Sequence, residues 1–111
     1  MESEYSFQFT EKAEEDLDDV ISYMTDTLGS PASASAFMDN VEETIEKLCL
    51  FPKSGPAVVN EYVKTSGIRR KAIGNYLLYY LPDEQKRILT VLRIIYGKRD
   101  PDAILRELDY S

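Results

Sequence analysis

The side chains best suited to chemistry in this 111-residue sequence are cations in its second half. They form two groups, Arg69, Arg70 and Lys71, and Lys98 and Arg99. The first group stands just before the aromatic run Tyr76–Leu81, and the second follows the apolar run that ends at Tyr96. Cations beside aromatic rings can bind phosphates and bases, and they bind the carboxylates of a protein equally well. The pattern indicates either a binding surface for anionic groups or a solvated basic face.

The sequence contains no histidine and a single cysteine, Cys49. This composition excludes Ser-His and Cys-His nucleophile pairs, imidazole metal ligands, an intramolecular disulfide and a multi-cysteine metal site. Cys49 lies among Leu48, Leu50 and Phe51, which predicts a small buried side chain rather than a reactive thiol. Acid–base work would fall to carboxylates, Lys, Tyr or Arg with perturbed pKa values. We therefore expect no metal and no cofactor.

Charge is distributed unevenly along the chain. Residues 1–50 hold 13 acidic and 2 basic side chains, whereas residues 51–111 hold 7 and 11, which gives the formal net charge of -7. Ionic screening acts over about 8 Å at physiological salt, so a partner of the second half responds to the local field. The net charge thus disfavours long-range attraction to nucleic acid but does not exclude an anionic partner.

The length of the chain predicts a single domain over residues 1–111. No apolar run approaches the roughly 20 residues that span a membrane. The start, MESEYSFQF, is acidic and polar, unlike a signal peptide. We expect a cytoplasmic protein that does not bind membranes.

The first half predicts a strand followed by a helical hairpin. Tyr5–Phe9 alternates apolar and polar residues, and Thr10 is placed to cap the next helix. Apolar residues at three- and four-residue spacing predict helices over 13–28 and 34–48. Gly29 and Pro31 lie between them, so the hairpin should be antiparallel with a connection of two or three residues.

The second half predicts three strands in a meander and a final helix. The strands are Ile68–Ile73, Tyr76–Leu81 and Arg87–Tyr96, with a tight turn at Gly74 and Asn75, and the helix is Asp102–Leu108. Residues 57–67 show no clear pattern and are expected to form a short helix or an irregular loop carrying Tyr62. The fold class is α+β, one sheet with the hairpin on one face and an open second face.

Four phrases in this order resemble toxins of the RelE/ParE superfamily, the toxins of bacterial type II toxin–antitoxin pairs. They are FTEKAEEDLDDVISY, FPKSGP, GIRR followed by GNYLLYYLPDE, and VLRIIYGKRD. The resemblance runs from about Glu4 to Leu108. It implies a cognate antitoxin of the ParD or RelB type as a partner, and a plasmid-stabilisation role.

The superfamily has two branches, which implies two targets. RelE-like toxins cleave messenger RNA on the ribosome, and ParE-like toxins poison DNA gyrase. RelE-like chains carry an arginine after the tyrosine of the penultimate strand, but Leu77 follows Tyr76 here. The second RelE-like arginine is matched by Arg99 in Gly97-Lys98-Arg99, whereas the late catalytic aromatic has no clear match near Leu105. The chain is closer to the ParE-like branch, with ribosome-dependent cleavage and an inactive binding module as alternatives.

Strand alternation gives the expected site. Arg69 and Lys71 should share one face and Arg70 the other, and Arg93 should share a face with Leu89, Val91 and Ile95. Neighbouring strands would then bring cations and tyrosines to one open surface. The predicted partner-binding residues are Arg69, Arg70, Lys71, Tyr79, Tyr80, Arg93, Tyr96, Lys98 and Arg99.

If the protein is a ribonuclease, little catalytic machinery is needed. A ribose 2′-hydroxyl attacks the adjacent phosphate, a base removes its proton, and cations stabilise the developing charge. Arg99 with Arg69 or Arg70 would then be catalytic, and Lys71 or Lys98 would be the base if cationic neighbours depress its pKa.

Overall fold

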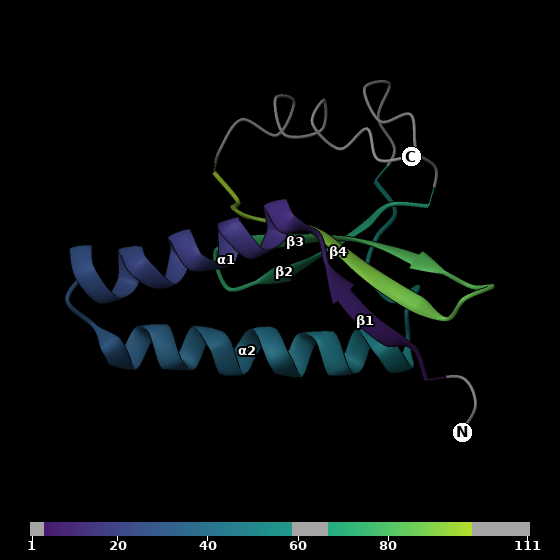
Figure 1. The fold of residues 1–111 in the computed structure, drawn as a ribbon, viewed down its shortest axis with the longest axis horizontal. Coiled ribbons are helices and arrows are strands. Elements are labelled where there is room, and N and C mark those ends of the chain that lie inside the picture. The colour runs from purple at the N-terminus through teal and green to yellow at the C-terminus, as the bar shows by residue number, and fades with distance from the viewer. Residues whose placement is uncertain (1–3, 59–66, 99–111) are drawn as a thin grey trace.

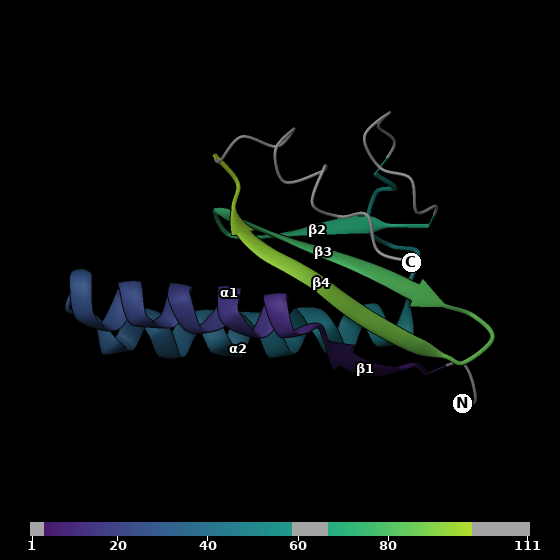
Figure 2. The same cartoon turned by 45° about the horizontal axis from the view of Figure 1, so that its top comes forward.

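The computed structural model describes residues 4–58 and 67–98. These residues form a four-stranded sheet of order β1-β4-β3-β2, with two helices on one of its faces (Figures 1 and 2). The predicted α+β class is confirmed. The expected helix Asp102–Leu108, Tyr62 and Arg99 lie outside the described residues. None of the helices within residues 4–58 and 67–98 combines the length and the hydropathy that a membrane-spanning helix requires.

The N-terminal strand, β1 (Ser6–Phe9), pairs in parallel with β4 (Ile88–Tyr96), so the sheet is mixed. Thr10 follows β1 and caps α1 (Glu11–Ser22), as predicted, because its Oγ1 accepts a hydrogen bond of 3.0 Å from the Ala13 N–H. The same hydroxyl donates to the Leu92 carbonyl at 3.0 Å. One side chain therefore starts the helix and fixes it to β4.

The helical hairpin contains a feature that the sequence pattern did not predict. α1 ends in a π-helical turn, η1 (Tyr23–Thr27), in which the Leu28 N–H donates to the Tyr23 carbonyl at 3.0 Å. Gly29 then has a positive φ of 62°, which suits glycine, and ends the helical segment as expected. Ser30 caps α2 (Pro31–Leu50) by accepting from the Ser33 N–H.

The meander is close to its prediction. β2 (Arg69–Ile73) and β3 (Tyr76–Asp83) pair antiparallel around the turn at Gly74, and β3 pairs antiparallel with β4. β3 runs two residues beyond the predicted end at Leu81. The register places Pro82 opposite Leu89, so the proline lies inside the strand rather than in the turn.

A β-bulge in β4 corrects the predicted face of Arg93. Tyr80 lies opposite Val91 and Tyr79 lies opposite Arg93, which leaves Leu92 as an extra residue. Because a bulge shifts the two-residue alternation, Arg93 does not share a face with Leu89 and Val91. The apolar clusters show the same break, since Val91 and Ile94, three residues apart, both pack on the helix side.

The core has two parts, one on each face of the sheet. The cluster beneath the helices includes Leu48, Leu78 and Tyr80, and it also contains Cys49, whose burial is confirmed. Burial raises the pKa of the Cys49 thiol above its ordinary value, and the charge of Glu4 adds to this effect. The far face carries its own buried cluster of Ile68, Tyr79, Leu92 and Ile95. The second face was expected to be open, and at this cluster it is instead buried.

Candidate partner-binding site

Two of the predicted site residues instead anchor the loop after α2. The Tyr80 hydroxyl donates to the Pro52 carbonyl at 2.8 Å and accepts from the Gly55 N–H at 3.1 Å. Arg69 Nη1 donates to the Lys53 carbonyl at 3.1 Å and the Gly55 carbonyl at 2.7 Å. A buried backbone needs such partners, so these two side chains hold the FPKSGP turn in place.

Gly55 shows how closely this loop approaches the sheet. A Cβ atom at this position would lie 2.5 Å from the Arg70 carbonyl oxygen and 2.6 Å from the Tyr80 hydroxyl. Both distances are far below van der Waals contact, so no other residue fits without moving the loop. The glycine of the FPKSGP phrase is therefore a packing requirement.

Arg93 forms a buried ion pair rather than part of an open cationic surface. Its Nε and Nη2 donate to the two carboxylate oxygens of Asp16 on α1, at 2.6 and 3.1 Å, and the side chains are 5 % and 7 % exposed. The Ile94 N–H also donates to Asp16, at 3.0 Å. Past the end of β1, the Ile94 N–H at the edge of β4 is thus hydrogen-bonded to a side chain of α1 instead of to a strand. α1 runs alongside this edge of the sheet (Figure 1).

The two central tyrosines are also buried. Tyr79 and Tyr80 are both 0 % exposed, so the expected surface position of these residues was wrong. The hydroxyl of Tyr79 is buried and has no hydrogen-bond partner in the described structure. Burial also raises the pKa of Tyr80, and the Gly55 hydrogen bond and the charge of Arg69 partly oppose that shift.

The remaining cations gather at one end of the sheet. A depression of about 560 Å³ is lined by Pro56, Arg70, Lys71, Ala72, Leu77 and Gly97. Arg70 is exposed and Lys71 half-buried, and the exposed Lys98 follows Gly97 directly. The Gly97 N–H donates to the Asn75 carbonyl at 2.8 Å, which joins the end of β4 to the β2–β3 turn. We call this depression, with Lys98, the basic depression.

The structure therefore divides the nine predicted residues. Arg70 and Lys71 line the basic depression, Lys98 follows Gly97 of its lining, and Arg69 is bonded to the carbonyls of the neighbouring loop. Tyr96 is 39 % exposed but contacts Tyr76 on the helix side, 5.6 Å between ring centroids, and does not line the depression. Leu77, which occupies the position of the RelE-like arginine, is in its wall.

Sequence reasoning missed the acid that neutralises Arg93. Asp16 is one of several acidic residues on α1, and the sequence analysis assigned it no role. Its signal was its place in the helix, because Ala13, Asp16 and Val20 are all buried and follow helical spacing. No group of three or more His, Cys, Asp or Glu side chains in the described ranges could hold a metal ion.

The fold is that of several solved toxins. It matches the P. aeruginosa chromosomal ParDE system with a TM-score of 0.67 and 19 % identity, over 86 % of this chain and 99 % of the other. The M. tuberculosis RelBE2 toxin–antitoxin complex matches with a TM-score of 0.60 and 23 % identity, over 84 % of this chain and 98 % of the other. The archaeal RelE–RelB complex of P. horikoshii matches with a TM-score of 0.57 and 14 % identity, over 86 % of this chain and 98 % of the other. A search of curated proteins returned no match.

The chain thus shares the fold of these toxin–antitoxin structures. Residues 7–101 match the sequence model described as the ParE toxin of the type II toxin–antitoxin system parDE. The chain belongs to this family.

Proposed function

We propose that this toxin inhibits DNA gyrase and that a small ParD-like antitoxin, encoded beside it, neutralises it. The observation that carries the proposal is the match of residues 7–101 to the ParE family. Leu77 supports the choice of target, because an apolar side chain packed against the far-face cluster replaces the arginine of RelE-like chains. Both partners are bacterial cytoplasmic components, which agrees with the expected location.

The basic depression is the proposed contact surface. Arg70 and Lys98 are exposed, and the wall of Pro56, Ala72 and Leu77 is apolar. Arginine–carboxylate pairs that are partly desolvated depend on local geometry rather than net charge, so an acidic chain can still bind acids here. In the resting cell the partner would be an acidic segment or carboxyl end of the antitoxin.

The first experiment expresses the chain alone and together with the adjacent small gene. We expect growth arrest with the toxin alone, rescue and co-purification with the antitoxin, and gyrase trapped on cleaved DNA. Normal growth without a co-purifying partner would reject the toxin–antitoxin assignment, whereas normal growth with a co-purifying partner would leave an inactive binding module.

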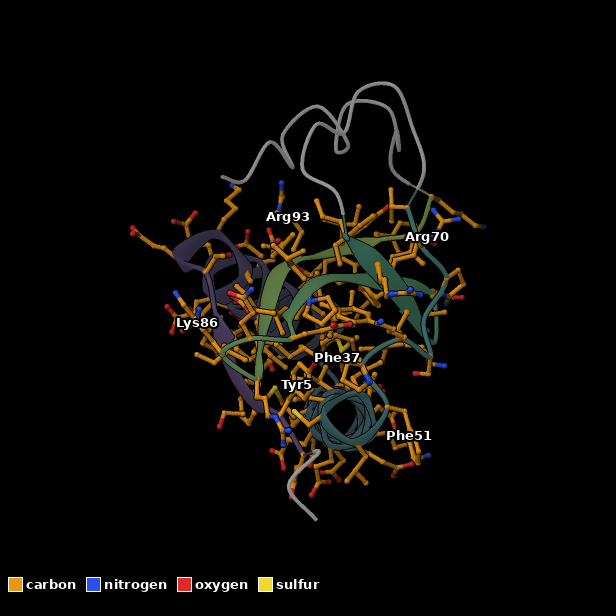
Figure 3. All side chains as sticks on the ribbon, turned by 90° about the vertical axis from the view of Figure 1, so that its right-hand side faces the viewer. Tyr5, Phe37, Phe51, Arg70, Lys86 and Arg93 are labelled. Atoms are coloured by element: carbon orange, nitrogen blue, oxygen red, sulfur yellow. The ribbon has the colours of Figure 1, made fainter. Side chains whose placement is uncertain are left out.

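The second experiment tests the depression with a charge-matched control. Arg70→Ala, Lys71→Ala and Lys98→Ala are combined in one variant, and Lys12→Ala, Lys47→Ala and Lys86→Ala in the other. The control residues are exposed and lie elsewhere, and Figure 3 shows Lys86 and Arg70 on opposite sides of the molecule. The first variant should lose at least about 2 kcal/mol of antitoxin affinity and fail to trap gyrase, whereas the control should do neither. Equal losses in both would mean that only net charge matters.

Ribosome-dependent cleavage of messenger RNA is the second candidate, favoured by the two cations, Arg70 and Lys71, that line one depression and by the fold shared with RelBE2. It predicts new RNA ends in translated messages on induction, with ribosomes required. Arg99→Ala should then lower cleavage at least tenfold, about 1.4 kcal/mol of barrier. Intact messages during growth arrest would reject it.

A further inference from the structure

A second pocket lies on the helix side of the sheet, away from the basic depression. It has a volume of about 540 Å³ and is bounded by α1, η1 and the adjoining ends of β3 and β4. Three tyrosines line it, Tyr23, Tyr76 and Tyr96. We call it the tyrosine pocket.

Its rings are held in place without being buried. Tyr76 packs against the buried Phe37, with ring centroids 5.1 Å apart, and meets Tyr96 edge to face at 5.6 Å. Tyr23 and Tyr96 nevertheless remain 47 % and 39 % exposed. Ring faces therefore stay accessible, and the negative face of an aromatic ring attracts a cation within about 6 Å.

The charges around the pocket also favour a cation. Two carboxylates, Asp16 and Asp19, line it. Asp16 is committed to Arg93 and the Ile94 N–H, whereas the exposed Asp19 has no ion-pair partner in the part of the chain that the structure describes. None of the described residues lining the pocket is basic. An anion would meet an uncompensated carboxylate, and a neutral apolar group would leave that carboxylate unused.

The backbone deviates from regular helix at this pocket. Tyr23 is the first residue of η1, where the bond from Leu28 spans five residues. π-helical turns are rare in proteins, and those that occur often lie at functional sites. It follows immediately after the acidic α1, so one segment supplies both an aromatic ring and a carboxylate.

We propose that the tyrosine pocket accepts a lysine or arginine side chain of the antitoxin. The inference rests on the proposed toxin–antitoxin function. A planar guanidinium stacks well on aromatic faces, and either cation can pair with Asp19. The basic depression binds an acid and the tyrosine pocket binds a base, so the two sites together fix the direction in which the partner segment lies across the toxin.

The test measures the affinity of the antitoxin encoded beside the gene for four single variants. Tyr96→Leu removes a ring and Asp19→Asn removes the carboxylate charge, and each should weaken binding about 5- to 30-fold. Tyr96→Phe keeps the ring face and should stay near wild type. Asp18→Asn makes the same charge change at the neighbouring exposed position, outside the described pocket lining, and should also stay near wild type.

A scan that replaces each antitoxin Lys and Arg by Met identifies the bound side chain. One replacement should weaken binding to the wild-type toxin and weaken binding to Tyr96→Leu by a smaller factor, because Tyr96→Leu has already removed part of the same contact. Tight antitoxin binding that Tyr96→Leu and Asp19→Asn leave unchanged would overturn the pocket assignment while the toxin–antitoxin function stands.

A second measurement does not need the antitoxin. The ring resonances of Tyr23, Tyr76 and Tyr96 are followed by NMR as Nα-acetyl-arginine amide or its neutral analogue Nα-acetyl-citrulline amide is added. Shifts with the arginine compound alone support the pocket, even if no antitoxin binds and the proposed function fails. Equal shifts with both compounds, or none, would overturn it.

Discussion

Tyr79 and Tyr80 are neighbours with equal burial but different hydrogen bonding, so the same substitution should change stability in opposite directions. Tyr80→Phe leaves the Gly55 N–H and the Pro52 carbonyl without their partner. A buried polar group left unsatisfied costs about 1–3 kcal/mol, so the free energy of unfolding should fall by about 2 kcal/mol. Tyr79→Phe removes a buried hydroxyl that has no partner in the described structure, and the free energy of unfolding should rise by roughly 1 kcal/mol.

The measurement is urea unfolding followed by far-UV circular dichroism, in which each variant is the control for the other. Both lose one oxygen atom from a fully buried tyrosine, so apolar burial and ring packing are matched. The two free energies should differ by about 3 kcal/mol, which corresponds to a Tm difference on the order of 12 °C. Equal destabilisation by both substitutions would refute the reasoning, because it would mean that Tyr79 has a partner of comparable worth.

Four further outcomes follow from the same contacts. Arg93→Met leaves the Asp16 carboxylate buried without its ion-pair partner, so the free energy of unfolding in urea should fall by about 3–5 kcal/mol. Adding Asp16→Asn should recover part of this loss. A fall of less than about 1 kcal/mol would contradict the burial of the pair. Gly55→Ala should destabilise more than Gly29→Ala, although Gly29 has a positive φ, because only Gly55 would clash with backbone; thermal unfolding ranks the two. The pKa of Tyr80 is raised in the folded protein above its ordinary value of 10.0, so the neutral hydroxyl stabilises the fold at pH values below 10.0. This contribution is lost as the pH rises through the higher pKa of the folded state. The free energy of unfolding, measured across that pH range, should therefore fall less steeply for Tyr80→Phe than for the wild type. Cys49 is buried with a raised pKa, so a thiol reagent should modify the native protein far more slowly than the urea-unfolded chain, and equal rates would exclude that burial.

Most of the fold could be predicted because its signals are local. The spacing of apolar residues predicted both helices, and Thr10 was correctly predicted to cap the first of them. The turn at Gly74 predicted the β2–β3 hairpin. The site was predicted less well because its geometry depends on contacts between distant parts of the chain. The bulge at Leu92 has no marker of its own, yet it moves Arg93 away from the face of Val91. Asp16 and Arg93 are 77 positions apart, and nothing in either segment alone indicates that they pair.

Similarly, Tyr80 and Arg69 looked like surface groups because their hydrogen-bond partners are backbone atoms of a loop. Every residue has a backbone carbonyl, so the residue types of the loop do not indicate these hydrogen bonds. The β2–β3 register, which places Arg70 and Lys71, could be predicted because it follows from the strand lengths and the turn at Gly74.

The parallel pairing of β1 with β4 has a consequence for how the toxin is made. β4 is one of the two central strands, and it is also the last strand of the described chain to be synthesised. Gln8 and Thr10 bond to residues 82 positions later, so β1 and the start of α1 have no sheet to join until translation has passed residue 92. Closing so long a loop is slow compared with local folding. A nascent toxin should therefore hold a formed helical hairpin but no complete sheet, and the antitoxin, if already present, meets its partner at the moment the fold closes.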